Sequence, residues 1–355
     1  MNLQPLQRFN RTYVGDYPFL QRLNDDWGRR RPLAGLSVLH NVPITRETLL
    51  KLESLLLGGA AVTVTHLRLP GLRPREDCIA VLKDAGVAVE IDHDRIAGRF
   101  DFALDCCAQI PAMAGVEIAR GYVELTQSGT PAYRALRTSL PIYSVDESKL
   151  KCLEGMYGTG EACVRAIKEF IKPELSGERF VLIGFGKVGR GVAKHLAGAG
   201  ARLVVCDVNP RARAQAERLG HATLAGDKGP ALRDAVNGAF AVIAATGVEG
   251  LVQRLVRPEE IAPKVHLINM GADDEYGEAF PQRRIAGDKA PLNFLLEAPT
   301  AMHFIDPIFG AHNRCCLDIL EAKDSGFRPL PADLDLPWVE EWSRRYGIDV
   351  SDIHD

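Results

Sequence analysis

A glycine-rich turn has residue types and spacing suited to binding a dinucleotide. Its residues, Gly184-Phe185-Gly186-Lys187-Val188-Gly189, follow an apolar run and open an amphipathic stretch. In such a turn the first glycine permits a tight bend, the second lets the backbone approach a pyrophosphate, and the third allows close helix–strand packing. The helix start would add N–H groups and a positive dipole. The pattern therefore predicts a pyrophosphate site formed by Gly184, Gly186, Lys187, Val188 and Gly189.

An acidic residue follows this turn at the distance that a nucleotide ribose requires. Asp207 ends the next apolar run, eighteen positions after Gly189. A carboxylate there can accept hydrogen bonds from both ribose hydroxyls and would repel a 2′-phosphate, so we predict NAD rather than NADP as the cofactor. Arg211 and Arg213 could approach a phosphate, which leaves NADP as the weaker alternative. Val208, beside the acid, joins the predicted cofactor contacts.

Two further apolar runs of this half end in small or polar residues. Ala245-Thr246-Gly247 closes one run and Asn269-Met270-Gly271 closes the next. The carboxyl ends of parallel strands are the edge where such sheets bind ligands. Thr246, Gly247, Asn269 and Gly271 are therefore predicted cofactor contacts. The acidic residues that follow, Asp273, Asp274 and Glu275, are interpreted as a solvated loop.

These residues require a framework of alternating strands and helices. Short apolar runs alternate with amphipathic stretches from residue 36 and again from residue 179, and glycines close many of the helices. This alternation predicts an α/β fold with two Rossmann-like domains, each built on a parallel, doubly wound sheet. We expect a substrate domain at 1–145, a linking helix and NAD-binding domain at 146–290, and a return segment with a C-terminal tail at 291–355. The linking helix should span about 146–171.

Composition argues against several classes of partner. The net charge is −3 and no long block of like charges occurs, so we expect no nucleic-acid partner. No apolar run is long enough to span a membrane, so we expect a soluble, cytoplasmic protein. The eight cysteines show no C-x-x-C pair, which predicts reduced thiols and no metal site. The doublets Cys106-Cys107 and Cys315-Cys316 receive no assigned role.

Motifs outside the glycine turn resemble those of the S-adenosylhomocysteine hydrolase family. The resemblance covers residues 36–320, is clearest at 184–210, and includes ITRETLLKLESLLLGGAAV, ELTQSG and PIYSVDESKLKCLEGMYGTGEA. It implies a tightly held NAD, a small-molecule substrate and assembly as a homodimer or homotetramer. It also implies that Thr126, Gln127 and Ser128 lie beneath the nicotinamide ribose and that Asn293 contacts the nicotinamide amide.

The residues that transfer protons in that family are mostly replaced here. The family's NAD oxidises a ribose 3′-hydroxyl, which allows homocysteine to be eliminated. In this chain the second aspartate of L-D-D-G-G is Cys106 and the second glutamate of E-E-T-T-T-G is Leu125. The histidines of N-x-G-H, of G-H-P and before M-T-V-E-T correspond to Ala272, Thr300 and Pro43, unless His40 replaces the last. The acidic run 273–275 is an alternative replacement for the first. Because none of these replacements can move a proton as the family's groups do, adenosylhomocysteine hydrolysis is disfavoured.

Four other residues are candidates for catalysis. Lys151 is the first choice as base, and Glu154, one helical turn later, could share its proton, although a solvated surface pair is the simpler interpretation. His40 ends an apolar run, where ligands usually bind. His303 is a candidate second proton donor, with Asp306 one helical turn away.

Three functions stay open on these residues. The first is an NAD-dependent enzyme that oxidises and reduces a small polar substrate, with net or transient redox, in a cleft between the domains. The second is a non-catalytic, NAD-sensing partner. The third is a true adenosylhomocysteinase-type hydrolase with replaced acid and base residues. An NADPH-linked reductase is a further variant of the first.

Overall fold

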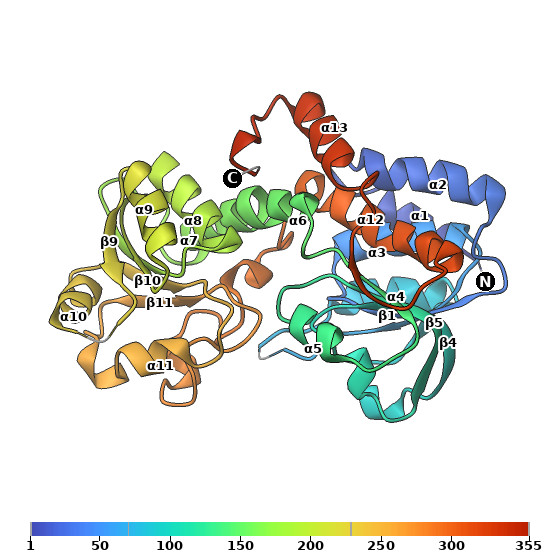
Figure 1. Cartoon of the computed structure of the whole chain (residues 1–355), viewed down its shortest axis with the longest axis horizontal. Helices are drawn as coiled ribbons and strands as arrows, with labels where there is room; N and C mark the ends of the chain where they lie inside the picture. The colour runs from blue at the N-terminus through green and yellow to red at the C-terminus, as the bar shows by residue number, and fades with distance from the viewer. Residues whose placement is uncertain (1, 70, 228, 354–355) are drawn as a thin grey trace. The chain divides into compact units, whose positions relative to one another are not determined.

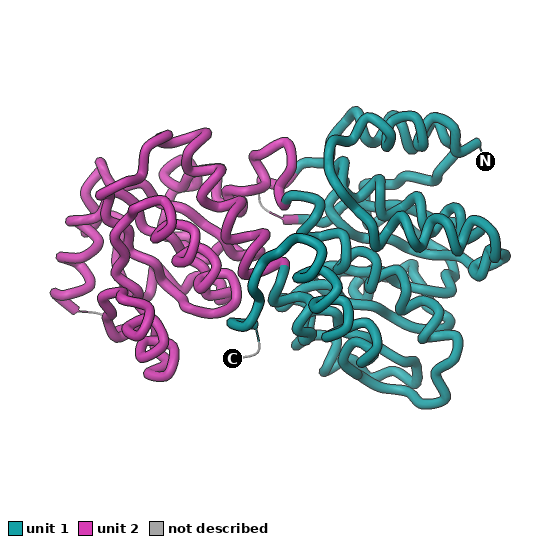
Figure 2. Tube along the Cα trace, turned by 90° about the horizontal axis from the view of Figure 1, so that it is seen from above, with its two compact units in different colours: residues 1–68, 73–153, 301–355 teal, residues 69–72, 154–300 magenta. Residues whose placement is uncertain are grey.

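The computed structural model describes residues 2–69, 71–227 and 229–353, which form two compact units (Figure 2). Unit 1 contains residues 1–68, 73–153 and 301–355, and unit 2 contains 69–72 and 154–300. Each unit has its own parallel sheet with helices, which confirms the predicted α/β fold. The units divide at 153/154 and 300/301, whereas the sequence placed domain boundaries at 145/146 and 290/291. Within the described residues, no helix is long and apolar enough to cross a membrane.

Unit 1 is built on a seven-stranded sheet with the order β12-β6-β5-β4-β1-β2-β3. From β1 the chain proceeds outward to β2 and β3, and then returns to place β4 on the other side of β1. The carboxyl ends of β1 and β4 therefore form the topological switch point, the edge position where such sheets bind ligands. The strands are β1 (Ser37–Asn41), β2 (Ala61–Thr65), β3 (Ala88–Val89), β4 (Gly98–Asp105), β5 (Val116–Glu124), β6 (Pro141–Ser144) and β12 (Gly326–Pro329) (Figure 1).

The helices of unit 1 begin where local sequence provides caps. Thr45 accepts a hydrogen bond from the Thr48 N–H at the start of α3, and Pro18 occupies the first turn of α2. The C-terminal tail forms a helix over Leu336–Tyr346, and the Trp338 ring packs 5.0 Å from the Phe19 ring. The helices are α1 (Gln4–Asn10), α2 (Pro18–Arg30), α3 (Arg46–Leu57), α4 (Glu76–Asp84), α5 (Thr130–Ala135), α6 (Lys149–Leu153), α12 (Met302–Glu321) and α13 (Leu336–Tyr346).

Unit 2 repeats the doubly wound plan with five strands in the order β11-β10-β7-β8-β9. Its switch point lies between β7 and β10, which pair in parallel. The strands are β7 (Arg179–Ile183), β8 (Arg202–Asp207), β9 (Ala222–Ala225), β10 (Ala241–Ala244) and β11 (His266–Asn269). The helices are α7 (Gly160–Phe170), α8 (Lys187–Gly198), α9 (Pro210–Arg218), α10 (Pro230–Asn237) and α11 (Leu251–Leu255).

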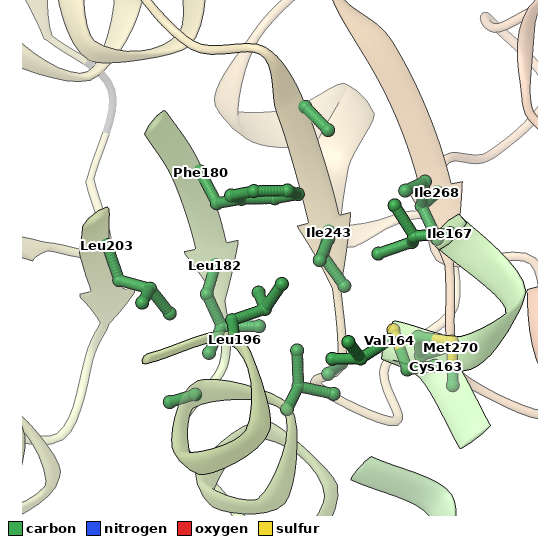
Figure 3. Packing of buried hydrophobic residues seen from close by; sticks show 14 of the residues in the cluster. Cys163, Val164, Ile167, Phe180, Leu182, Leu196, Leu203, Ile243, Ile268 and Met270 are labelled. Carbon is green, nitrogen blue, oxygen red and sulfur yellow. The ribbon is translucent and has the colours of Figure 1, made fainter. Parts of the chain in front are cut away.

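The predicted linking helix is present and changes its winding. It runs as α6, then as a π-helical stretch η3 (Glu154–Thr159), then as α7. Figure 3 shows α7 side chains, including Ile167, packing on the core side of the unit 2 sheet beside Ile243 and Ile268. A Cβ on Gly160 would lie 2.3 Å from the Gly191 carbonyl carbon, so α7 and α8 cross at glycines.

Candidate functional site

The glycine turn of unit 2 has the geometry that its sequence predicts. Gly184 follows β7 with φ +96, and a Cβ there would lie 2.6 Å from the Ala245 carbonyl oxygen. A Cβ on Gly189 would lie 2.1 Å from the Gly184 carbonyl oxygen. Glycine is therefore required at both positions to let the strand turn directly into α8 at the β7/β10 switch point.

The middle glycine differs from its neighbours because nothing in the protein fills the space beside it. A Cβ on Gly186 would have no described atom within 4 Å, and its φ of −77 suits any residue. Gly186 is also the N-cap of α8, which begins at Lys187 and Val188 without a side-chain cap. An open space at an uncapped helix N-terminus fits an anionic pyrophosphate.

Asp207 lies beside this turn, and its carboxylate can still accept hydrogen bonds from ligand hydroxyl groups. Its two carboxylate oxygens accept the Phe185 and Asn209 N–H groups, both at 2.7 Å. Each oxygen retains a second lone pair, which fits the two hydroxyls of a ribose. Val208 is 73% exposed and offers an apolar surface next to the acid. Arg213 donates to the backbone carbonyls of Asp207 and Val208, so its guanidinium is engaged in the loop.

The strand ends of β10 and β11 are organised by a carboxylate that the sequence interpretation missed. Glu275 is fully buried and accepts hydrogen bonds from the Thr246 N–H and hydroxyl and from the Gly247 N–H. The expectation of a solvated acidic loop at 273–275 is therefore wrong for Glu275. A Cβ on Gly271 would lie 2.1 Å from the Glu275 carboxylate, so this glycine makes room for it. Burial raises the pKa of Glu275, and the Thr246 and Gly247 donors oppose the rise.

Two asparagines of unit 2 differ in how fully their amides are used. The Asn269 amide donates to three carbonyl oxygens of nearby loops and accepts the Gly271 N–H. Asn293 is buried and donates to the Pro299 carbonyl oxygen at 2.9 Å, but its Oδ1 has no partner among the described residues. An unpaired buried acceptor fits the amide N–H of a nicotinamide, the contact that the family resemblance implies.

In unit 1, a row of buried polar side chains marks the carboxyl edge of the sheet. The last residues of five neighbouring strands are polar and fully buried, and the strand register places them side by side: Thr65, Asn41, Asp105, Glu124 and Ser144. We call these five residues the strand-end row. Asn41 joins β1 to β4 across the switch point by donating to Asp105 Oδ1 at 2.8 Å.

The two carboxyls of the strand-end row hold the loop that follows β4. Asp105 accepts the Cys106 and Ile110 N–H groups, and burial raises its pKa to about 6. Glu124 accepts the N–H groups of Cys107 and Ala108. Burial, and then the Asp105 charge, raises the pKa of Glu124 well above its ordinary value. These carboxyls therefore fix the backbone around the cysteine doublet.

The predicted nicotinamide contacts of unit 1 lie next to this loop. The Thr126 N–H and hydroxyl hydrogen-bond to Glu124, and the Ser128 hydroxyl lies 3.0 Å from Cys107 Sγ. Gln127 lies between them and is exposed. Leu125 is an almost completely buried apolar residue and carries no group that could transfer a proton.

The four candidate catalytic residues have different surroundings. Lys151 lies on α6, and its charge opposes the raised pKa of the Cys106 thiol, which hydrogen bonding to Cys107 and burial produce. Glu154 is buried and begins the π-helical stretch, so the regular spacing from Lys151 ends there. His40 precedes the true strand end, Asn41, and is fully buried with Nε2 2.9 Å from Lys51 Nζ.

His303 and Asp306 begin α12, but they have separate neighbours. The His303 ring stacks on Trp342 with an interplanar angle of 11° and lies beside Tyr346, both on α13. Asp306 is fully buried and accepts the Phe19 and Leu20 N–H groups, which belong to the first turn of α2. Asp306 therefore holds the N-terminus of a helix rather than serving as a partner of His303.

Comparison with known proteins identifies the same segment of the chain as the glycine-turn motif does. Residues 155–276 match the family described as S-adenosyl-L-homocysteine hydrolase, NAD binding domain. This segment contains the glycine turn, Asp207, Thr246 and Gly271. The family match and the fit of the turn, the acid and the Asn293 amide together identify NAD as the cofactor of unit 2.

Relatives of this chain are 25–28% identical to it over the aligned residues. An adenosylhomocysteinase of Thermotoga maritima is 27% identical over 223 residues, which are 56% of this chain and 55% of that protein. An S-inosyl-L-homocysteine hydrolase of Methanopyrus kandleri is 28% identical over 54% of this chain and 50% of that protein. These matches span about half the length of the relatives. An adenosylhomocysteinase of Haloquadratum walsbyi is 25% identical over 95% of this chain and 88% of that protein.

Proposed function

Because this chain belongs to the S-adenosylhomocysteine hydrolase superfamily, we propose that it is an NAD-dependent enzyme that oxidises and reduces a small polar substrate. The redox is net or transient, and the reaction differs from adenosylhomocysteine hydrolysis. The observation that carries the proposal is a contrast within the chain. The features that fit NAD are present in unit 2, whereas Cys106 and Leu125 stand at positions where the resemblance implies carboxylates.

The protonation states of the two replacing residues show which reactions they can support. The hydrogen bond with Cys107 and burial raise the pKa of Cys106 well above its ordinary value of 9.0, so its thiol is neutral near pH 7 and cannot replace a carboxylate base. Leu125 has no proton to exchange. A carboxylate-dependent elimination therefore loses two of its groups, whereas hydride transfer from a carbinol or amine carbon needs one base for the departing proton.

Lys151 is the residue that we propose for this base. NAD supplies the hydride acceptor when bound. The Lys151 amine would receive the proton that leaves the substrate hydroxyl or amine, and its charge already acts on Cys106, beside the strand-end row. Glu154, three residues after Lys151, would assist by sharing the proton that Lys151 receives. His40 is less suited to this role because its ring is fully buried against Lys51.

The cofactor part of the proposal is tested with Gly186→Val. The added side chain meets no protein atom at Cβ, so the fold should persist, but it would fill the space proposed for the pyrophosphate. We expect wild-type protein purified without added cofactor to release NAD on denaturation, identified by mass spectrometry. Gly186→Val should bind NAD at least about tenfold more weakly. Gly229→Val is the matched control, because Gly229 is also a helix N-cap in unit 2 with open space beside it.

The redox part is tested by incubating NAD-loaded protein with alcohols, amines and nucleosides while recording the absorbance of reduced nicotinamide. A substrate should produce NADH in wild type and in the exposed-lysine control Lys168→Ala, and much less in Lys151→Ala. NAD binding without reduction by any of these compounds would favour a non-catalytic NAD sensor. Release of homocysteine from adenosylhomocysteine would favour a true hydrolase. Equal NAD binding by wild type and Gly186→Val would contradict the proposed cofactor site.

A further inference from the structure

The loop after β4 holds a cysteine in an unusual backbone conformation. Cys107 and Ala108 have φ of +64 and +51, the left-handed region that favours glycine. A non-glycine residue in this region has a strained backbone. Both N–H groups donate to the Glu124 carboxyl at 3.1 Å, which fixes the conformation. Because a glycine would avoid the strain, the loop retains a thiol at a fixed position despite it.

The surroundings of Cys107 favour an ionised thiol. Its Sγ lies 3.0 Å from the Ser128 hydroxyl and 3.7 Å from the Thr126 hydroxyl. The Cys106 thiol lowers the pKa of Cys107, the two hydroxyls lower it further, and burial and the Asp105 charge oppose them. Burial instead raises the pKa of the core cysteines Cys78, Cys163 and Cys316 to about 12. Cys107 is also only partly buried, as is Cys152.

Unpaired polar atoms beside this loop indicate a ligand. Asn41 is fully buried, and its amide nitrogen donates to Asp105 and lies 3.5 Å from the Cys106 carbonyl oxygen. These two acceptors fix the orientation of the amide, and Asn41 Oδ1 has no partner among the described residues. The Thr65 hydroxyl, next to Asn41 in the strand register, is also buried without a described partner. Buried acceptors of this kind are normally satisfied by a donor on water or on a ligand.

We propose that Cys107 is the nucleophile of a covalent binding site in unit 1, and that its ligand is a small aldehyde bearing a neighbouring hydroxyl group. The site lies at the β1/β4 switch point, where parallel sheets bind ligands. The ligand hydroxyl donates to Asn41 Oδ1, and the aldehyde carbon is attacked by Cys107 Sγ.

The addition is balanced without any oxidant or reductant. The thiol proton leaves to solvent, and a sulfur lone pair forms the S–C bond. The C=O π bond breaks toward oxygen, which takes a proton from solvent, and the product is a thiohemiacetal. The step uses neither NAD nor Lys151. A test of this covalent addition can therefore fail without contradicting the proposed redox function. The thiolate is the nucleophile, and the Ser128 and Thr126 hydroxyls stabilise it.

The first test measures thiol reactivity in the full-length protein. Limiting iodoacetamide is applied at about pH 6 to 9, and each cysteine is quantified by peptide mass spectrometry. Near pH 7 we expect Cys107 to be labelled about tenfold or more faster than Cys152, another partly exposed cysteine. Ser128→Ala should slow this labelling and move its midpoint to higher pH, whereas Ser325→Ala, at an exposed serine, should change neither.

The second test measures the ligand. Glycolaldehyde, which carries both groups, should slow the alkylation of Cys107 but not that of Cys152. Ethylene glycol, which lacks the carbonyl, should not protect, and acetaldehyde, which lacks the hydroxyl, should protect less. Cys107→Gly should lose the fast-labelled site and fold at least as stably as wild type, because glycine suits the positive φ. Labelling of Cys107 no faster than Cys152, or equal protection by glycolaldehyde and ethylene glycol, would overturn the proposal.

Discussion

Lys51 is a fully buried lysine, and its environment should make the stability of unit 1 depend on pH. It lies on α3 with Nζ 2.9 Å from His40 Nε2 and 5.9 Å from the centre of the Phe309 ring. Among the described residues, no carboxylate forms an ion pair with it. Burial lowers its pKa from 10.5 to about 7, while the thiols of Cys316 and Cys106 oppose the shift.

Proton binding by Lys51 in the folded and unfolded states determines whether the free energy of unfolding rises or falls with pH. Unfolded Lys51 binds a proton below about 10.5, whereas folded Lys51 binds it below about 7. Between these values the unfolded state holds more protons, so the free energy of unfolding rises with pH. The stability from this group is complete above the unfolded pKa and is lost as pH falls toward the folded one. The slope is about 1.4 kcal/mol per pH unit, and the difference in pKa corresponds to roughly 5 kcal/mol as an upper bound.

Lys51→Met should remove this dependence while preserving most of the side-chain volume. The variant leaves His40 Nε2 unpaired, at a cost of about 1–3 kcal/mol that does not change over this pH range. The difference in unfolding free energy between wild type and variant should therefore increase by about 1 kcal/mol for each pH unit above neutrality. The His312 ring, which faces the same lysine, has a pKa lowered well below 6.5 by burial and stays neutral over this range.

Urea unfolding at about pH 7, 8 and 9 measures this difference. Tryptophan fluorescence reports on unit 1 alone, because Trp27, Trp338 and Trp342 all belong to it. Lys83→Met, at an exposed position on α4, is the matched control and should follow wild type at every pH. Parallel pH profiles for wild type and Lys51→Met would refute the argument, because they would mean that the buried amine has the same proton affinity in both states.

Three further changes test the packing that positions the two sites. Asp306→Ala should lower the urea stability of unit 1 by about 2 kcal/mol, because two buried N–H groups at the start of α2 lose their acceptor. Gly191→Ala should push α8 away from the π-helical stretch η3 and speed hydrogen exchange in both, since its Cβ would lie 2.2 Å from the Met156 carbonyl oxygen; Gly198→Ala, with open space, should not. Tyr276→Phe should cost unit 2 about 1–2 kcal/mol in thermal or urea unfolding followed by circular dichroism, because the buried hydroxyl bonds to Val242 and Ile268.

The dinucleotide turn could be predicted because its signals are local. Gly184 and Gly189 are needed for contacts within one strand, turn and helix, and Asp207 closes the next strand. A strand–turn–helix unit of this kind is specified by residues close together in sequence. The same locality explains why both parallel sheets could be inferred from alternating apolar runs.

The surroundings of the proposed catalytic residues could not be predicted, because they depend on distant segments. Helical spacing suggested that His303 and Asp306 act together, but Asp306 bonds to backbone 287 and 286 residues away. His40 was expected at a strand end, but the strand continues by one residue, and the His40 side chain is fully buried against Lys51. Nothing in the pattern around Lys51 distinguishes a buried lysine from one on a solvated helix face.

The strand-end row explains how this edge can change its chemistry without losing its shape. Asp105 and Glu124 hold the loop after β4 through its backbone N–H groups, and the side chains that follow them are not needed for that purpose. Cys106 and Leu125, the replaced positions, come directly after these two carboxyls. Substitution there alters the available acids and bases while the loop geometry persists. We propose thiol and amine groups as the reactive groups at this edge, and carbonyl compounds, alcohols and amines are therefore the substrates to test first.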